Sequence, residues 1–160
     1  MPTPTAPETS PASAVVELSP RRTIGRIVLA TDLSPASAGA TDQALELACS
    51  LRADLLVVSV IDSATSLSSG PVPRMDQRRA ARELAAQAIV VRGRRMGVGV
   101  SFLVWEGAPG PAIVEAAQSE AADMIIVGTR GRGRVERFVL GSVSDHVVRH
   151  AACPVLIVRA

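Results

Sequence analysis

The stretch from residue 27 to residue 35 reads IVLATDLSP, and the expected fold starts from it. Its first four residues form a continuous apolar run, which is typical of a strand buried on both faces of a sheet. Ser34 and Pro35 then read as a helix N-cap followed by a first-turn proline. Apolar residues recur at helical spacing from Ala44 to Leu51. A strand that leads directly into a helix is the first unit of an α/β fold.

The rest of the chain repeats this alternation of strand and helix. The expected strands are Ile27–Ala30, Leu55–Ile61, Val98–Val104, Met124–Val127 and Pro154–Val158. The expected helices follow Ser34, cover the apolar repeat at 81–88, follow the turn at 107–111, and run from about Gly141 to His150. The third strand alternates apolar with more polar residues, which favours a sheet edge. This order predicts a single doubly wound α/β domain, with a five-stranded, mostly parallel sheet and helices on both faces.

The two ends of the chain differ in composition. Residues 1–22 are rich in Pro, Ser, Thr and Ala and follow no period, so we expect a disordered tail before one domain at 23–160. No apolar run reaches the roughly 18 residues that a membrane span needs. The N-terminus lacks the basic and apolar regions of a signal peptide. We therefore expect a cytoplasmic protein with no membrane segment.

The basic residues exclude several classes of site. Net charge is +2, and all 17 basic residues are arginines. A chain without lysine has no Walker-type phosphate lysine and no Schiff-base chemistry. The small net charge and the shortage of aromatic residues argue against nucleic-acid binding, although an RNA-binding interpretation of the Arg-Gly repeat at 130–134 stays open.

The stretch 128–144 reads GTRGRGRVERFVLGSVS and carries the candidate chemistry. Glycines let backbone N–H groups approach an anion closely. Gly141 and Ser142 open the last helix, whose free amides and positive dipole end favour a phosphate. Arg130 and Arg132 flank Gly131 and offer bidentate donors to a phosphate, although they also suit a solvated basic loop. The stretch predicts a phosphate site that needs no lysine.

The spacing of these glycines resembles a known pattern. Gly128, two residues, Gly131, nine residues and Gly141-Ser142 are similar to the G-x2-G-x9-G-S/T motif of ATP-binding universal stress proteins. Further stretches resemble that family's first strand (27–34), its second strand (57–61) and its C-terminal signature (141–144 followed by 153–158). The resemblance covers about residues 24–159. It departs from the commoner pattern at Ala30 and Ser59, where the family more often has Pro and His.

The resemblance implies a strand order of 3-2-1-4-5 and ATP as the ligand, with Mg²⁺ left open. It implies that Asp32 contacts the adenosine part and that Val60 meets adenine through its backbone. A turn-forming or helix-capping Asp32 is the alternative. The glycine-rich stretch and the start of the last helix would then hold ribose and phosphates. The expected site residues are Ala30, Thr31, Asp32, Val60, Gly128, Arg130, Gly131, Arg132, Gly133, Gly141, Ser142, Val143 and Ser144.

The function that this resemblance implies is regulatory. We expect an ATP-binding protein that works by nucleotide-dependent switching of conformation or partner, and not a fast enzyme. No nucleophile elbow or pair of carboxylates for a magnesium-centred hydrolytic site is evident in the sequence. A slow ATPase and a binder of AMP or cyclic AMP are the alternatives. Residues 154–158 are apolar and, in this strand order, lie at a sheet edge, so we also expect a homodimer through this strand.

Overall fold

A parallel sheet forms the centre of the computed structural model, which describes residues 23–63, 75–129 and 140–159. Its strands are β1 (Arg26–Ala30), β2 (Asp54–Asp62), β3 (Val100–Gly107), β4 (Met124–Thr129) and β5 (Val155–Arg159). The strands lie in the order β3-β2-β1-β4-β5, and all four pairings are parallel. The predicted fold class and strand order are therefore confirmed, as is the edge position of the third strand.

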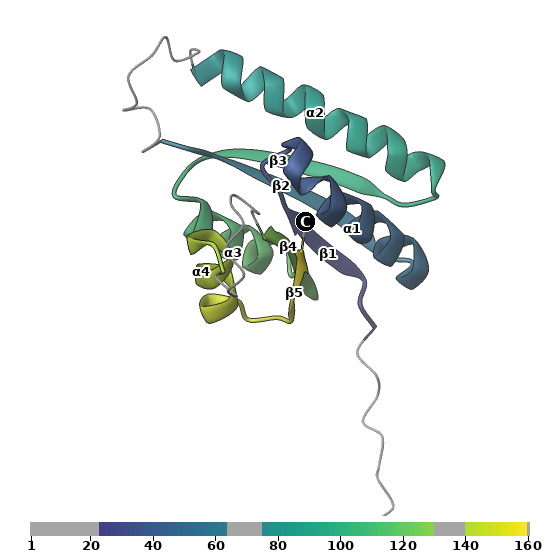
Figure 1. The fold of residues 1–160 in the computed structure, drawn as a ribbon. Helices are drawn as coiled ribbons and strands as arrows, with labels where there is room; N and C mark the ends of the chain where they lie inside the picture. Colours follow the sequence, from purple (N-terminus) through teal and green to yellow (C-terminus); the bar gives the residue numbers. More distant parts are fainter. Residues whose placement is uncertain (1–22, 64–74, 130–139, 160) are drawn as a thin grey trace, which may run out of the picture.

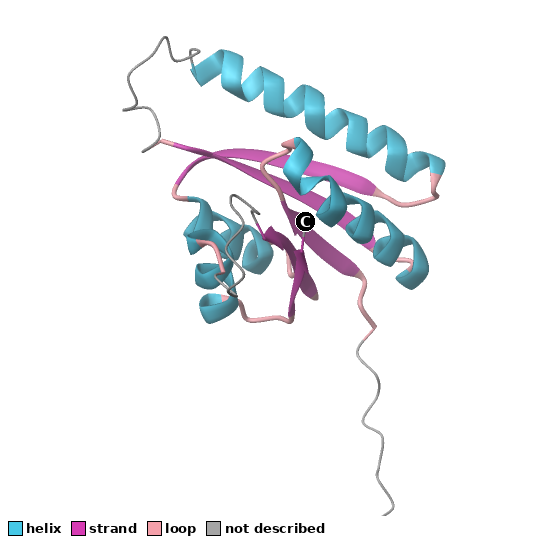
Figure 2. Ribbon diagram, in the orientation of Figure 1, coloured by secondary structure: helices cyan, strands magenta, loops and turns pink. Residues whose placement is uncertain are grey.

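Helices cover both faces of the sheet (Figures 1 and 2). A short 3-10 helix, η1 (Pro35–Ser37), leads into α1 (Ala38–Leu51). The others are α2 (Met75–Arg95), α3 (Pro109–Ser119) and α4 (Ser142–His150). Helices α1 and α2 pack on one face, and α3 and α4 pack on the other. In the described residues, no helix has both the length and the apolar character that a membrane crossing would require.

The core follows the period of two along the central strand. Ile27 and Leu29 of β1 pack toward α1 and α2, whereas Val28 and Ala30 pack toward α3 and α4. All four side chains are buried. Because both faces of β1 are covered, its sequence reads as a continuous apolar run and not as an alternation. Full burial of one such aliphatic side chain stabilises the fold by about 1.5–3 kcal/mol.

Two helix ends follow local sequence signals. Pro35 is the first residue of η1, as predicted. Gly97 has φ +75° just after α2, in the left-handed region that glycine adopts at little cost. Ser34 precedes η1, but its hydroxyl makes no capping bond and donates instead to the carboxylate of Asp32. The predicted tail at 1–22 lies outside the described residues.

The topology places a crevice beside β1. The carboxyl ends of all five strands lie along the same side of the sheet because every pairing is parallel. The chain leaves β1 toward α1 on one face, while α4, the next helix after β4, packs on the opposite face. Neighbouring strands whose connections diverge in this way define a topological switch point, where open α/β sheets bind ligands.

Candidate functional site

A cavity of about 380 Å³ opens at this switch point. Its size lies within the range of about 300–1,000 Å³ that is ordinary for small-molecule sites. It is lined by nine of the thirteen residues that the sequence predicts: Ala30, Thr31, Asp32, Val60, Gly128, Gly141, Ser142, Val143 and Ser144. The other four lie outside the described residues: Arg130, Gly131, Arg132 and Gly133. The fold therefore brings together residues from four separate segments of the chain.

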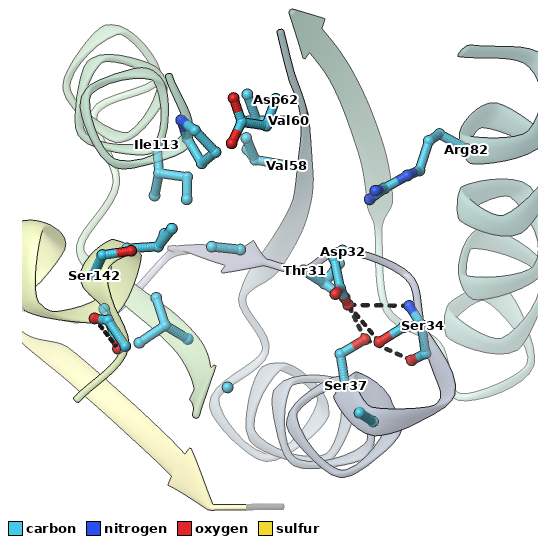
Figure 3. Close-up of a pocket in the computed structure, with 18 of the residues that line it drawn as sticks. Thr31, Asp32, Ser34, Ser37, Val58, Val60, Asp62, Arg82, Ile113 and Ser142 are labelled. Atoms are coloured by element: carbon cyan, nitrogen blue, oxygen red, sulfur yellow. Dashed lines mark hydrogen bonds between the residues drawn. The ribbon is translucent and has the colours of Figure 1, made fainter. Parts of the chain in front are cut away.

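The first wall is the turn after β1, which its own side chains hold (Figure 3). The Asp32 carboxylate accepts the Ser34 N–H at 3.1 Å and the Ser34 hydroxyl at 2.7 Å. Thr31 Oγ1 accepts the Leu33 N–H at 3.0 Å and donates to Ser37 Oγ at 2.8 Å. These bonds accompany a left-handed conformation at Leu33, with φ 59°. The turn-forming role of Asp32 is thus present, and its carboxylate also lines the cavity.

The second wall is the end of β2, which runs past the end of β1. The Thr31 N–H donates to the Val58 carbonyl at 3.0 Å, so the peptide groups of Val58 face β1. In a parallel sheet, the next residue whose peptide groups face the same neighbour is two positions on. That residue is Val60, and there the chain of β1 has already turned away through Asp32. The backbone of Val60 therefore faces the cavity, in agreement with its predicted position.

The third wall is the N-terminus of α4. Gly141 precedes the helix, and its carbonyl accepts the Asp145 N–H at 2.9 Å and the Ser144 hydroxyl at 3.0 Å. The first N–H groups of a helix have no carbonyl partner within that helix. Here these are the amides of Ser142, Val143 and Ser144, all of which line the cavity. They bring the positive end of the helix dipole to one side of the cavity, which is the arrangement that binds anions.

Gly128, at the end of β4, fills a packing role as well. A Cβ built at this position would lie 3.3 Å from Ala40 Cβ on α1. That contact is tighter than a side chain usually tolerates, so the missing side chain lets α1 pack close to β4. Gly141 differs, because a Cβ there meets only Ser144 Oγ at 3.6 Å, an ordinary contact.

This geometry agrees with a match to known proteins. A sequence model of the Universal stress protein family matches residues 23–159. The chain belongs to this family. A universal stress protein of Methanocaldococcus jannaschii is 31% identical over 141 residues, which cover 84% of this chain and 81% of that one.

Solved universal stress proteins share the fold. A crystal structure of a family member from Burkholderia pseudomallei has a TM-score of 0.70 and 29% identity, and the match covers 88% of this chain and 100% of that one. Another universal stress protein, crystallised in complex with cAMP, has a TM-score of 0.67 and 26% identity, with 86% and 98% covered.

Sequence reasoning missed several residues of the cavity in this universal stress protein. Those missed include Arg78 and Arg82, which helix α2 contributes. The cavity is also lined by Asp62, the acidic residue that ends β2. The signal available for the two arginines was their spacing of four, which places them on one face of a helix. The helical repeat that predicted α2 begins only at 81, so it did not place this pair. Among the described residues, no group of three or more His, Cys, Asp or Glu side chains is arranged to hold a metal ion.

Proposed function

We propose that this protein binds an adenine nucleotide in the cavity at the switch point, with ATP as its ligand. One observation carries the proposal. The turn that holds Asp32 and the first residues of α4 line the same cavity, although Asp32 and Gly141 lie 109 positions apart in the sequence. One wall offers a carboxylate for hydroxyl groups and the other offers N–H donors for phosphates. A ligand with a sugar and a phosphate satisfies both.

In this proposal each part of the nucleotide has its own partners. The phosphates lie at the N-terminus of α4, where the amides and the Ser142 hydroxyl donate to them. Asp32 contacts the adenosine part, and adenine meets the backbone of Val60. The apolar side chains of Val60 and Ile113 enclose the base. The complex of a family relative with cAMP supports an adenine nucleotide as the class of ligand.

Titration calorimetry with ATP, AMP and cyclic AMP tests the ligand and ranks these alternatives. At a concentration of ~100 Kd, a ligand stabilises a protein by about 2.7 kcal/mol, which corresponds to a rise in Tm of roughly 5–10 °C for a chain of this size. We expect this rise with ATP in protein first shown by mass spectrometry to be free of nucleotide. No heat and no rise in Tm with any of the three would overturn the proposal.

We further propose that the nucleotide regulates and is not turned over rapidly. A ligand held between the β1 turn and α4 favours the conformation in which both walls contact it, and so changes the surface that a partner meets. Incubation with labelled ATP should show hydrolysis far below the ~10 s⁻¹ that is typical of enzymes. A rate above roughly 1 s⁻¹ that is lost in the Gly131→Val variant would instead indicate an ATPase.

A homodimer through β5 is also part of this proposal. Strand β5 is an edge of the sheet, and its Leu156 side chain is 37% exposed. Val155 and Ile157 are half-buried against the α3 and α4 side of the core, so Leu156 is the better side chain to test. Sedimentation equilibrium at ~100 μM, where a micromolar interface is occupied, should find twice the chain mass. The Leu156→Lys variant should shift this toward the monomer, and a wild-type monomer would contradict the prediction.

A further inference from the structure

The arginines of α2 occupy unusual positions for charged side chains. Toward its C-terminal end this helix turns Ala86, Ile89 and Gly93 inward, all of them buried. Arg82 and Arg78 lie one and two turns before Ala86. They therefore continue the inward face of α2, where an apolar side chain is ordinary, and there they line the cavity. A small number of polar groups placed on the wall of a cavity usually sets the orientation of its ligand, so these two guanidinium groups are candidate ligand contacts.

Arg82 is held in place by the sheet. Its Nη1 donates to the Oγ of Ser59 at 2.7 Å, and Ser59 lies on β2 with only 1% of its surface exposed. A guanidinium carries five N–H donors in a rigid plane, so it can bond to protein groups and to a ligand at once. The buried hydroxyl of Ser59 fixes that plane at the cavity wall, and a donor fixed in advance loses less entropy on binding.

Arg82 lies across the cavity from the start of α4. Figure 3 shows its guanidinium and the Ser142 side chain on opposite sides, with Asp32 between them on the β1 turn. If phosphates occupy the α4 side, the groups nearest Arg82 belong to the other end of the ligand. The ring nitrogens of a base and the oxygens of a ribose are acceptors for N–H donors.

We propose that Arg82, oriented by Ser59, contacts the nucleoside half of the nucleotide. This assignment rests on the proposed function. Arg82 then differs from an arginine that binds phosphates, because its contribution to the binding free energy does not depend on the number of phosphates on the nucleotide.

The test compares AMP with ATP, which share a nucleoside and differ in phosphates. We expect Arg82→Met to weaken both about 10-fold, the size of one hydrogen bond to a charged group. Arg82→Lys keeps the charge but loses the planar fork, so it should also weaken both. Ser59→Ala removes only the anchor, and we expect a loss of about 3-fold for each nucleotide. These two milder variants carry the test if Arg82→Met does not fold.

Arg79→Met is the matched control. Arg79 lies on the same helix, but its guanidinium bonds to the Val104 carbonyl at 3.2 Å and to Glu106 at 3.0 Å, at the outer strand β3. It does not line the cavity. Its variant should bind both nucleotides as the wild type does. Calorimetry gives the affinities, and circular dichroism with a melting scan checks the fold.

Two results would overturn the assignment while leaving the proposed function intact. In the first, wild-type protein binds both nucleotides and the Arg82 variants bind them equally well. In the second, the loss is clearly larger for ATP than for AMP, which would place Arg82 at the phosphates. A wild-type protein that binds neither nucleotide overturns the proposed function, and this assignment with it.

Discussion

The two connections that flank the cavity are built in opposite ways. The turn after β1 is short and is held by hydroxyl and carboxylate side chains, which make five hydrogen bonds among Thr31, Asp32, Leu33, Ser34 and Ser37. The start of α4 presents backbone amides, and its N-cap residue is a glycine with no side-chain capping bond. The wall at the β1 turn depends on which side chains are present. The wall at the start of α4 depends on the absence of a side chain that would cover the backbone amides. Substitutions should therefore damage the first by removing atoms and the second by adding them.

The largest effect is expected where an added side chain blocks the backbone wall. In Gly141→Val the new side chain should keep phosphates away from two or more amides of α4, which weakens ATP binding by about 100-fold or more. The fold should persist, because φ at Gly141 is −61° and a Cβ there makes only an ordinary contact. Gly39→Val is the control, since Gly39 is exposed on α1 and a Cβ there meets no atom within 4 Å. Normal calorimetric titration of Gly141→Val would show that phosphates do not lie at α4.

A smaller loss of ATP affinity is expected when Asp32 is removed from the turn after β1. Asp32→Ala removes the acceptor of two bonds to Ser34 and the carboxylate of the cavity, so we expect about 10-fold weaker binding. Asp32→Asn retains an oxygen that accepts from Ser34 but loses the charge, and it separates the two roles. Weakened titration in both variants supports a contact with the ligand. Weak binding by Asp32→Ala beside normal binding by Asp32→Asn would mean that Asp32 only shapes the turn.

The smallest effect is expected at Ser37, which supports the turn from η1. Ser37→Ala removes the 2.8 Å bond from Thr31 Oγ1 and the 2.8 Å bond that the Ser37 hydroxyl donates to the Ser34 carbonyl, and it should lower the free energy of unfolding by about 1–2 kcal/mol. Affinity should fall by less than about 3-fold, because the ligand-facing groups stay in place. Urea denaturation measures the first quantity and calorimetry the second. Ser50→Ala, which loses only a bond to Glu46 on the exposed side of α1, is the control. A loss of affinity as large as that of Asp32→Ala would contradict this ranking.

The same contrast explains what the sequence made predictable. Glycines at the spacing of a family motif can be located in the sequence, so Gly128 and the start of α4 were predicted as site residues, and they line one cavity. The fold also followed from local patterns, because a strand buried on both faces reads as an apolar run. Residues such as Ser34 and Ser37 carry no such signal, since serines near a helix start predict capping in general.

Arg78 and Arg82 were missed for a different reason. Their position at the cavity depends on how α2 packs against β2, which is a tertiary relationship between segments about 20 residues apart. An arginine with helical spacing is ordinarily solvated, and no local pattern shows that the inward face of this helix reaches a cavity. Only the packing of α2 against the sheet reveals it.

The all-parallel sheet has a practical consequence for handling this protein. Residue 23 leads into the amino end of β1, and the five residues of β1 separate it from the cavity by roughly 16 Å at about 3.3 Å per residue. Strand β5 ends on the opposite side, at the carboxyl ends of the strands, where Val158 pairs with Gly128 of the cavity wall. The described chain therefore enters the sheet at residue 23 away from the cavity and leaves it at Arg159 on the side where the cavity lies. An environment-sensitive fluorophore attached at position 159, which pairs with Thr129 next to Gly128 of the cavity wall, is therefore better placed to report ligand binding than one attached at residue 23.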